Sequence, residues 1–194
     1  MSNTTSKMAL LVMDMQVEIV TRYAQTGDFL TSTSTAITAA RAASIPVIYV
    51  VVAFRPGYPE ISPKNKSFSA IKQQLSSSST PMFAPEIHPA ITPQPTDIVV
   101  TKRRVSAFSG SDLEMVLRAQ DISHLVLCGI ATSGVVLSTL REAADKDYQL
   151  TVLADCCIDG DEEVQRVLLS KVFPRQAEVL QADAWTAKLT GEIQ

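Results

Sequence analysis

The sequence predicts a three-layer α/β domain, a doubly wound sheet of about six mainly parallel strands with helices on both faces. Short runs in which nearly every residue is apolar recur along the chain, and amphipathic segments lie between them. Strands that are apolar at consecutive positions are buried on both faces, as parallel strands are. Their alternation with helices implies right-handed crossovers and a sheet covered on both sides.

The expected strands are the apolar runs themselves, at residues 8–13, 46–52, 97–100, 124–128, 150–154 and 177–180. The expected helices are the alanine-rich segment 34–44 and three segments with apolar residues at helical spacing, 112–120, 135–146 and 162–172. Eight of the ten prolines lie within residues 55–96, together with four consecutive serines. Because proline fixes φ and removes a backbone donor, we expect mostly irregular structure there, as in long functional loops.

Composition favours one domain over residues 1–194, because 46% of the residues are hydrophobic and the net charge is only -3. The chain is not basic enough to predict nucleic acid as a partner. No apolar run approaches the roughly 20 residues that span a bilayer, and the run at 8–13 is too short for a signal peptide. An odd number of cysteines, three, suits a reducing compartment. We therefore expect a cytoplasmic protein with neither nucleic-acid nor membrane partners.

Polar residues follow three of the expected strands. Asp14 and Gln16 follow the first strand, Lys102 ends the third, and the segment 129–134 follows the fourth. In open parallel sheets, ligands bind beyond the carboxyl ends of the strands. A carboxylate and an ammonium there can share a proton-transfer task, and a turn into a helix offers N–H donors for developing negative charge. The alternative for Asp14, a helix cap or a surface ion pair, stays open at this point.

Other sites with chemical potential have less support. The sequence has no glycine motif of the dinucleotide-binding or P-loop type, so we expect no cofactor. His88 and His124 are expected to be structural or solvated, and no Cys-x-x-Cys occurs, so we expect no metal site. Cys128 lies in a buried strand as a small apolar residue, whereas Cys156 and Cys157 are a weak indication of redox chemistry.

Three motifs, in this order, resemble those of the isochorismatase-like hydrolase superfamily, also called the cysteine hydrolase family. They are ALLVMDMQ at 9–16, TKRRVSAF at 101–108 and GIATSGVV at 129–136. The resemblance implies a Rossmann-like parallel sheet, usually of six strands, and a catalytic set of Asp, Lys and Cys. The aspartate falls on Asp14 and the lysine on Lys102. In this family the peptide bond that falls between Ile130 and Ala131 is commonly cis.

The resemblance places the nucleophilic cysteine of the family at Val135, which has no nucleophilic atom. Thioester-type amide hydrolysis is therefore disfavoured. True isochorismatases also lack this cysteine and hydrolyse an enol ether with an acid and no nucleophile. The resemblance thus implies Asp14 as the acid or base and Lys102 as its electrostatic partner. The aspartate and histidines that bind metal in nicotinamidases have no counterpart here, which agrees with the expected absence of a metal.

These observations predict a hydrolase of a small anionic or carbonyl-bearing metabolite. Two alternatives are a catalytically silent binding or regulatory protein that kept the pocket, and a cysteine hydrolase whose thiol lies elsewhere. Relatives are often homo-oligomers, so we expect a homo-oligomer, with the apolar stretch around Trp185 either at its interface or in the core. The residues expected to bind the substrate are Gln16, Phe108, Ile130, Ala131, Ser133 and Gly134.

Overall fold

A computed structural model describes residues 7–23, 28–75 and 85–191 of the chain. At its centre is a six-stranded sheet in the order β3-β2-β1-β4-β5-β6, with every neighbouring pair parallel. This doubly wound order confirms the predicted fold class, and it reverses between β1 and β4, where such folds bind ligands. The strands are β1 Met8–Met13, β2 Val47–Val52, β3 Ile98–Lys102, β4 His124–Ile130, β5 Gln149–Ile158 and β6 Glu178–Leu180.

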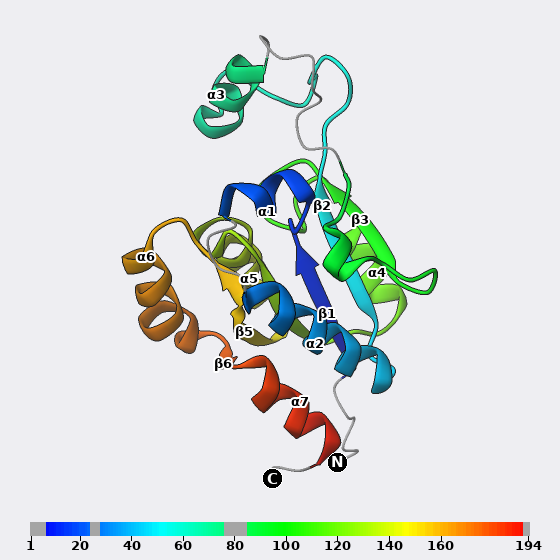
Figure 1. Cartoon of the computed structure of the whole chain (residues 1–194). Coiled ribbons are helices and arrows are strands. Elements are labelled where there is room, and N and C mark those ends of the chain that lie inside the picture. Colours follow the sequence, from blue (N-terminus) through cyan, green and yellow to red (C-terminus); the bar gives the residue numbers. More distant parts are fainter. Residues whose placement is uncertain (1–6, 24–27, 76–84, 192–194) are drawn as a thin grey trace.

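Helices cover both faces of the sheet (Figure 1). Helices α2 and α7 lie side by side on one face, and α5 lies on the other. Among the described residues, none of these helices is both long and apolar enough to cross a membrane. The helices are α1 Val17–Tyr23, α2 Asp28–Ala42, α3 Lys66–Leu75, α4 Leu113–Ala119, α5 Leu137–Asp145, α6 Glu162–Val167 and α7 Ala182–Thr190, with the shorter turns η1 Pro89–Ile91, η2 Thr132–Val136, η3 Leu168–Val172 and η4 Phe173–Arg175.

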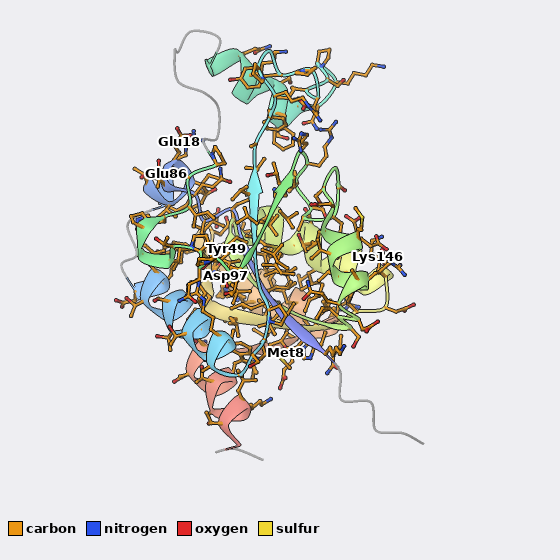
Figure 2. The ribbon with its side chains drawn as sticks, turned by 90° about the vertical axis from the view of Figure 1, so that its right-hand side faces the viewer. Met8, Glu18, Tyr49, Glu86, Asp97 and Lys146 are labelled. Atoms are coloured by element: carbon orange, nitrogen blue, oxygen red, sulfur yellow. The ribbon has the colours of Figure 1, made fainter. Side chains whose placement is uncertain are left out.

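The proline-rich segment contains a helix that its composition did not predict. Helix α3 forms over Lys66–Leu75, a stretch without proline, and the side chain of Asn65 accepts a hydrogen bond from the N–H of Phe68 at 3.1 Å. Asparagine in this position satisfies a donor that the first turn leaves free. Helix α3 stands away from the sheet in both views (Figures 1 and 2). The four-serine run at 76–79 lies outside the described residues.

The core forms around strands β1, β2 and β4, whose residues are almost all buried. Trp185 on α7 is only 3% exposed and belongs to this core. Of its two expected roles, the structure therefore gives it the one in the core.

An ion pair joins α2 to the amino end of β3. Arg41 on α2 contacts the carboxylate of Asp97, just before β3, and its guanidinium also donates to the hydroxyl of Tyr49 on β2 at 3.3 Å. The second partner of the Asp97 carboxylate is the N–H of Gln94, at 2.7 Å. Figure 2 shows Tyr49 and Asp97 beside each other. The cluster therefore connects helix α2 to strand β2 and to the start of β3.

Candidate functional site

The two predicted catalytic residues meet at the carboxyl edge of the sheet. Asp14 follows β1 and Lys102 ends β3, and β2 separates the two strands. The Asp14 Oδ2 and Lys102 Nζ atoms are 2.8 Å apart, and the two side chains are only 9% and 2% exposed. Asp14 has a φ of 56°, a left-handed conformation uncommon for residues other than glycine. The chain turns sharply at the point where it presents this carboxylate.

The Lys102 ammonium is held on three sides. Besides Asp14, it donates to the backbone oxygen of Arg104 at 2.9 Å and to that of Val105 at 3.0 Å. An ammonium has three N–H donors, so these three contacts use all of them. Lys102 is therefore arranged to act on the Asp14 carboxyl group rather than to grip a ligand directly.

The Asp14 carboxyl group keeps one oxygen without a partner. Its Oδ1 atom is buried and accepts no hydrogen bond within the described part of the chain. Burial raises the pKa of Asp14 to about 6, while the charge and hydrogen bond of Lys102 oppose this rise. A carboxyl group with a pKa near the working pH can both give and take a proton. The site thus has the chemistry of a general acid or base.

Gln16 fixes the loop that follows Asp14. Its Nε2 donates to the oxygen of Val52 at 3.1 Å, and its Oε1 accepts from the N–H of Val52 at 2.8 Å. Gln16 is fully buried and pairs in antiparallel fashion with Ile87. The structure gives its amide a role in holding the end of β1 to the end of β2. Its assignment as a substrate-binding residue stays a prediction.

The segment after β4 forms the opposite side of the site. The peptide bond between Ile130 and Ala131 is cis, as the resemblance implies. Gly129 allows β4 to approach β1 closely, because a Cβ atom at this position would lie 2.6 Å from the oxygen of Met13. Val135, in η2, is 2% exposed. The position at which the resemblance places the thiol of the family is therefore a buried isopropyl group.

The turn after β4 has a carboxylate partner that the sequence reasoning missed. The Ser133 N–H donates to Asp159 Oδ2 at 2.7 Å, so one of the predicted backbone donors is already engaged. Asp159 follows β5, and the same strand-end rule that selected Asp14 selects it too. Next to Ser133, the Oγ1 atom of Thr132 is buried and has no partner in the described residues. Both residues add polar groups to the carboxyl edge.

Phe108 lies against the segment between α5 and β5. Its ring centroid is 6.0 Å from that of Tyr148, and the Lys146 Nζ atom is 5.5 Å from the ring. The neighbouring Ala107 N–H donates to Thr139 Oγ1 on α5 at 2.9 Å. These contacts attach the TKRRVSAF motif to α5. The role of Phe108 in substrate binding remains a prediction that none of them tests.

The cysteines are free and buried. The thiol of Cys128 donates to the oxygen of Leu11, on the neighbouring strand β1, at 3.3 Å. Burial raises the pKa of Cys128 and Cys156 well above the ordinary value and that of Cys157 to about 12. Nucleophilic cysteines need the opposite shift, because the thiolate is the reactive form.

The two histidines occupy structural positions. His124 Nε2 lies 2.9 Å from Thr151 Oγ1 at the amino end of β4, and burial lowers the pKa of the ring. His88 Nδ1 accepts from the N–H of Ala90 at 3.2 Å and so caps η1. In the described part of the chain, no three His, Cys, Asp or Glu side chains gather in a way that could hold a metal ion.

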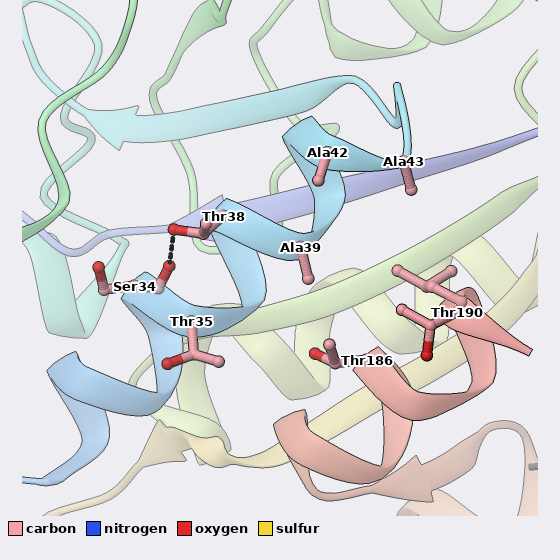
Figure 3. A pocket seen from close by; sticks show the side chains of 9 residues that line it. Ser34, Thr35, Thr38, Ala39, Ala42, Ala43, Thr186 and Thr190 are labelled. Carbon is pink, nitrogen blue, oxygen red and sulfur yellow. Dashed lines mark hydrogen bonds between the residues drawn. The ribbon is translucent and has the colours of Figure 1, made fainter. Parts of the chain in front are cut away.

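A groove of about 510 Å³ lies elsewhere, between α2 and α7 (Figure 3). Small side chains line it, and its hydroxyl groups donate to carbonyls of their own helices, as Thr38 does to Ser34 and Thr186 to Ala182, both at 2.8 Å. Neither Asp14 nor Lys102 lines this groove. The threonine hydroxyls of the groove are therefore paired within their own helices, and the candidate catalytic residues lie at the carboxyl edge instead.

Known proteins are similar to this chain over most of its length. A family model, the isochorismatase domain, matches residues 8–184. The isochorismatase family protein YwoC of Bacillus subtilis is 34% identical over 169 residues, covering 87% of this chain and 87% of that protein. Ureidoacrylate amidohydrolase RutB of Methylobacterium radiotolerans is 35% identical over 159 residues, covering 76% of this chain and 62% of that protein.

Among solved structures, an isochorismatase family protein from Burkholderia thailandensis is similar with a TM-score of 0.79 and 30% identity, covering 95% of this chain and 96% of that one. Sequence and fold thus agree over nearly the whole chain. The protein belongs to the isochorismatase family, the isochorismatase-like hydrolases.

Proposed function

We propose that this protein hydrolyses a small metabolite by acid–base catalysis, with Asp14 as the proton donor and Lys102 as the cation that orients it. The single observation that carries the proposal is the buried Asp14–Lys102 pair, in which Oδ2 is held at 2.8 Å and Oδ1 has no partner. An oxygen without a partner can hydrogen-bond to a substrate that reaches it, and burial raises the pKa of Asp14, which favours the protonated form of the carboxyl group.

The reaction that suits this arrangement is hydrolysis of an enol ether. Protonated Asp14 gives its proton to the enol carbon, and the electrons of the double bond form the new C–H bond. Water adds to the resulting oxocarbenium carbon and loses a proton to the Asp14 carboxylate. The hemiketal then collapses to a carbonyl compound and an alcohol. Lys102 stabilises the carboxylate that forms after the first transfer, because opposite charges attract strongly in a dry site.

We also propose that this chain is a family member without the usual catalytic thiol. Val135 stands at the position of that thiol, and burial raises the pKa values of the three cysteines. The relative RutB is an amidohydrolase by name, and from this similarity we infer for the present chain only the hydrolysis of a small molecule. Three unpaired cysteines are also consistent with our proposal of a cytoplasmic location.

A second candidate function is small-molecule binding without turnover, and Val135 is the observation that favours it. The isopropyl side chain provides no nucleophile at the position where the resemblance places the thiol, whereas Asp14 and Lys102 remain in contact. A silent family member would keep the buried Asp14–Lys102 pair and release its ligand unchanged.

A metabolite panel tests both functions. Small carboxylates, enol ethers, amides and carbonyl compounds are screened by thermal shift, because a ligand that binds the folded state raises Tm. Each ligand found is then incubated with the enzyme and analysed by mass spectrometry, with the Asp14→Asn variant as the control. Hydrolysis that the variant lacks supports the proposed activity. Ligands recovered unchanged contradict it and support the silent binder.

A further inference from the structure

Strand β3 forms one edge of the sheet and has backbone groups that face away from its neighbour. The oxygen of Lys102 accepts from the N–H of Ala53 at 3.2 Å, so the backbone groups of Lys102 point toward the β2 side. Alternate residues of a strand point their N–H and C=O groups to opposite sides. The backbone groups of Val99 and Thr101 therefore point outward, to the side where the described residues form no further strand.

Exposed apolar side chains gather at this same edge. Among the described residues, the large apolar side chains with high exposure are Met115 at 68%, Val99 at 51% and Val105 at 37%. They come from α4, from β3 and from the loop between these elements, which lie near each other in Figure 1. Val99 and Met115 line a shallow groove of about 450 Å³, together with Thr101. Apolar surface thus coincides with strand backbone groups that face away from every strand the structure describes.

The opposite edge of the sheet is protected in the usual way. Strand β6 has only three residues, and Glu178 on it forms an ion pair with Lys188 of α7. Short strands and charged side chains are the devices by which proteins prevent edge-to-edge pairing. At the β3 edge, the outward positions are occupied by valine and threonine instead.

We propose that β3 pairs with β3 of a second copy of this chain, so that the two sheets join across a twofold axis beside Val100. A twofold axis makes the two strands antiparallel. Val99 then exchanges both backbone hydrogen bonds with Thr101 of the partner subunit, and the reciprocal exchange follows by symmetry. Val100, whose backbone groups face β2, falls at the non-hydrogen-bonded position between these pairs. The alternation of an antiparallel ladder is therefore satisfied.

The charges on the groove are compatible with a second copy. Arg103 and Asp112 both line it, so the surface has one charge of each sign and two copies meet without net repulsion. Arg103 is also held by Glu60, with 3.2 Å between Nε and Oε1. The contact covers Val99 and Met115 of both copies. An isologous interface of this kind uses the same patch twice, which is how closed dimers form.

Light scattering coupled to size-exclusion chromatography tests the interface with three proteins. The wild-type protein is expected to be a dimer, or a larger assembly of dimers. The Val99→Lys variant, which places two charges beside the axis, is expected to raise the dissociation constant at this interface at least 100-fold. The Thr31→Lys variant is the control, because Thr31 is exposed on α2 and does not line the groove, so this variant is expected to assemble like the wild-type protein. Wild-type monomers, or a Val99→Lys variant with unchanged assembly, overturn the proposal.

Hydrogen exchange on the wild-type protein keeps the test independent of any variant that fails to fold. The amides of Val99 and Thr101 are expected to be protected at high protein concentration and to exchange at least tenfold faster on dilution. The amide of Val100, which faces β2, stays protected at both concentrations. Fast exchange of Val99 and Thr101 at every concentration contradicts pairing. Neither measurement depends on turnover, so the outcome is separate from that of the proposed function.

Discussion

The two ends of β3 each adjoin a buried carboxylate paired with a cation. At the amino end, Asp97 accepts hydrogen bonds from Arg41 and from the backbone of Gln94, and Arg41 also reaches Tyr49. At the carboxyl end, Lys102 donates to Asp14 and to two backbone oxygens, and within the described residues Asp14 keeps one buried oxygen without a partner. The first pair joins a helix to the sheet, whereas the second leaves an acceptor for a molecule that is not part of the chain.

This difference shows how a structural ion pair is distinguished from a candidate catalytic one. Both carboxylates are buried, with 4% of the Asp97 side chain and 9% of the Asp14 side chain exposed, so burial alone does not separate them. Of the two residues, Asp14 alone has a left-handed φ and a fully buried oxygen that lacks a partner in the described part of the chain, and burial raises the pKa of Asp14 to about 6. Variants at the two carboxylates test this distinction, because the expected effects on activity and on stability differ between them.

The largest expected effect is the loss of turnover in the Asp14→Asn variant. The amide keeps the shape of the carboxyl group but cannot donate an acidic proton, so kcat is expected to fall by about 10³-fold on the substrate that the panel identifies. The matched variant, Asp97→Asn, is expected to retain kcat within twofold. Steady-state kinetics on both variants, with circular dichroism to confirm folding, make this comparison. Equal losses in the two variants would mean that the pairs do not differ in function.

The next effect concerns the stability that the amino-end pair provides. The Asp97→Ala variant leaves the Arg41 guanidinium without its carboxylate, and we expect the free energy of unfolding to fall by about 2 to 3 kcal/mol. The Lys188→Ala variant removes the more exposed pair with Glu178 and is expected to cost under about 1 kcal/mol. Urea denaturation of both variants measures the difference. A smaller loss for Asp97→Ala than for Lys188→Ala contradicts the structural role of the amino-end pair.

A smaller effect is the pH dependence that Asp14 imposes on the rate. Because burial raises its pKa to about 6, the protonated fraction falls about tenfold per pH unit above this value. With Asp14 as the acid catalyst, kcat/KM is therefore expected to decrease as the pH rises from 6 to 8 and to level off below pH 6. The profile of the Asp97→Asn variant serves as the control and should keep the same inflection. A rate that rises through pH 6 would instead identify Asp14 as a base.

The fold and the positions of Asp14 and Lys102 were predictable because both follow from rules about neighbours in sequence. Consecutive apolar residues mark buried parallel strands, and the carboxyl ends of such strands share one edge. Strand β1 has the predicted bounds, Met8–Met13, and the residue directly after it is Asp14. The strand order decides which ends meet, and it confirms the doubly wound class.

The details of the site depend on contacts between distant segments, which a single sequence does not specify. The pairing of Gln16 with Val52, and that of Ser133 with Asp159, join residues that lie 36 and 26 positions apart. The burial that raises the pKa of Asp14 is likewise a property of the folded layers. The proline frequency of the whole segment 55–96 predicts irregular structure and so does not predict helix α3, although no proline falls within the ten residues of this helix.

The smallest expected effect, and the one that tests the proposed loss of the catalytic thiol, is the response to alkylation. The three cysteines are at most 4% exposed, and burial raises their pKa values, so iodoacetamide should react slowly with the folded protein. Activity on the identified substrate is expected to change by less than twofold after treatment, while the urea-unfolded protein is alkylated at three positions. Mass spectrometry counts the modified thiols in both samples. Inactivation that proceeds in step with the modification of one cysteine in the folded protein would show that a thiol takes part, and the acid–base proposal for Asp14 would then fail even with the carboxyl edge intact.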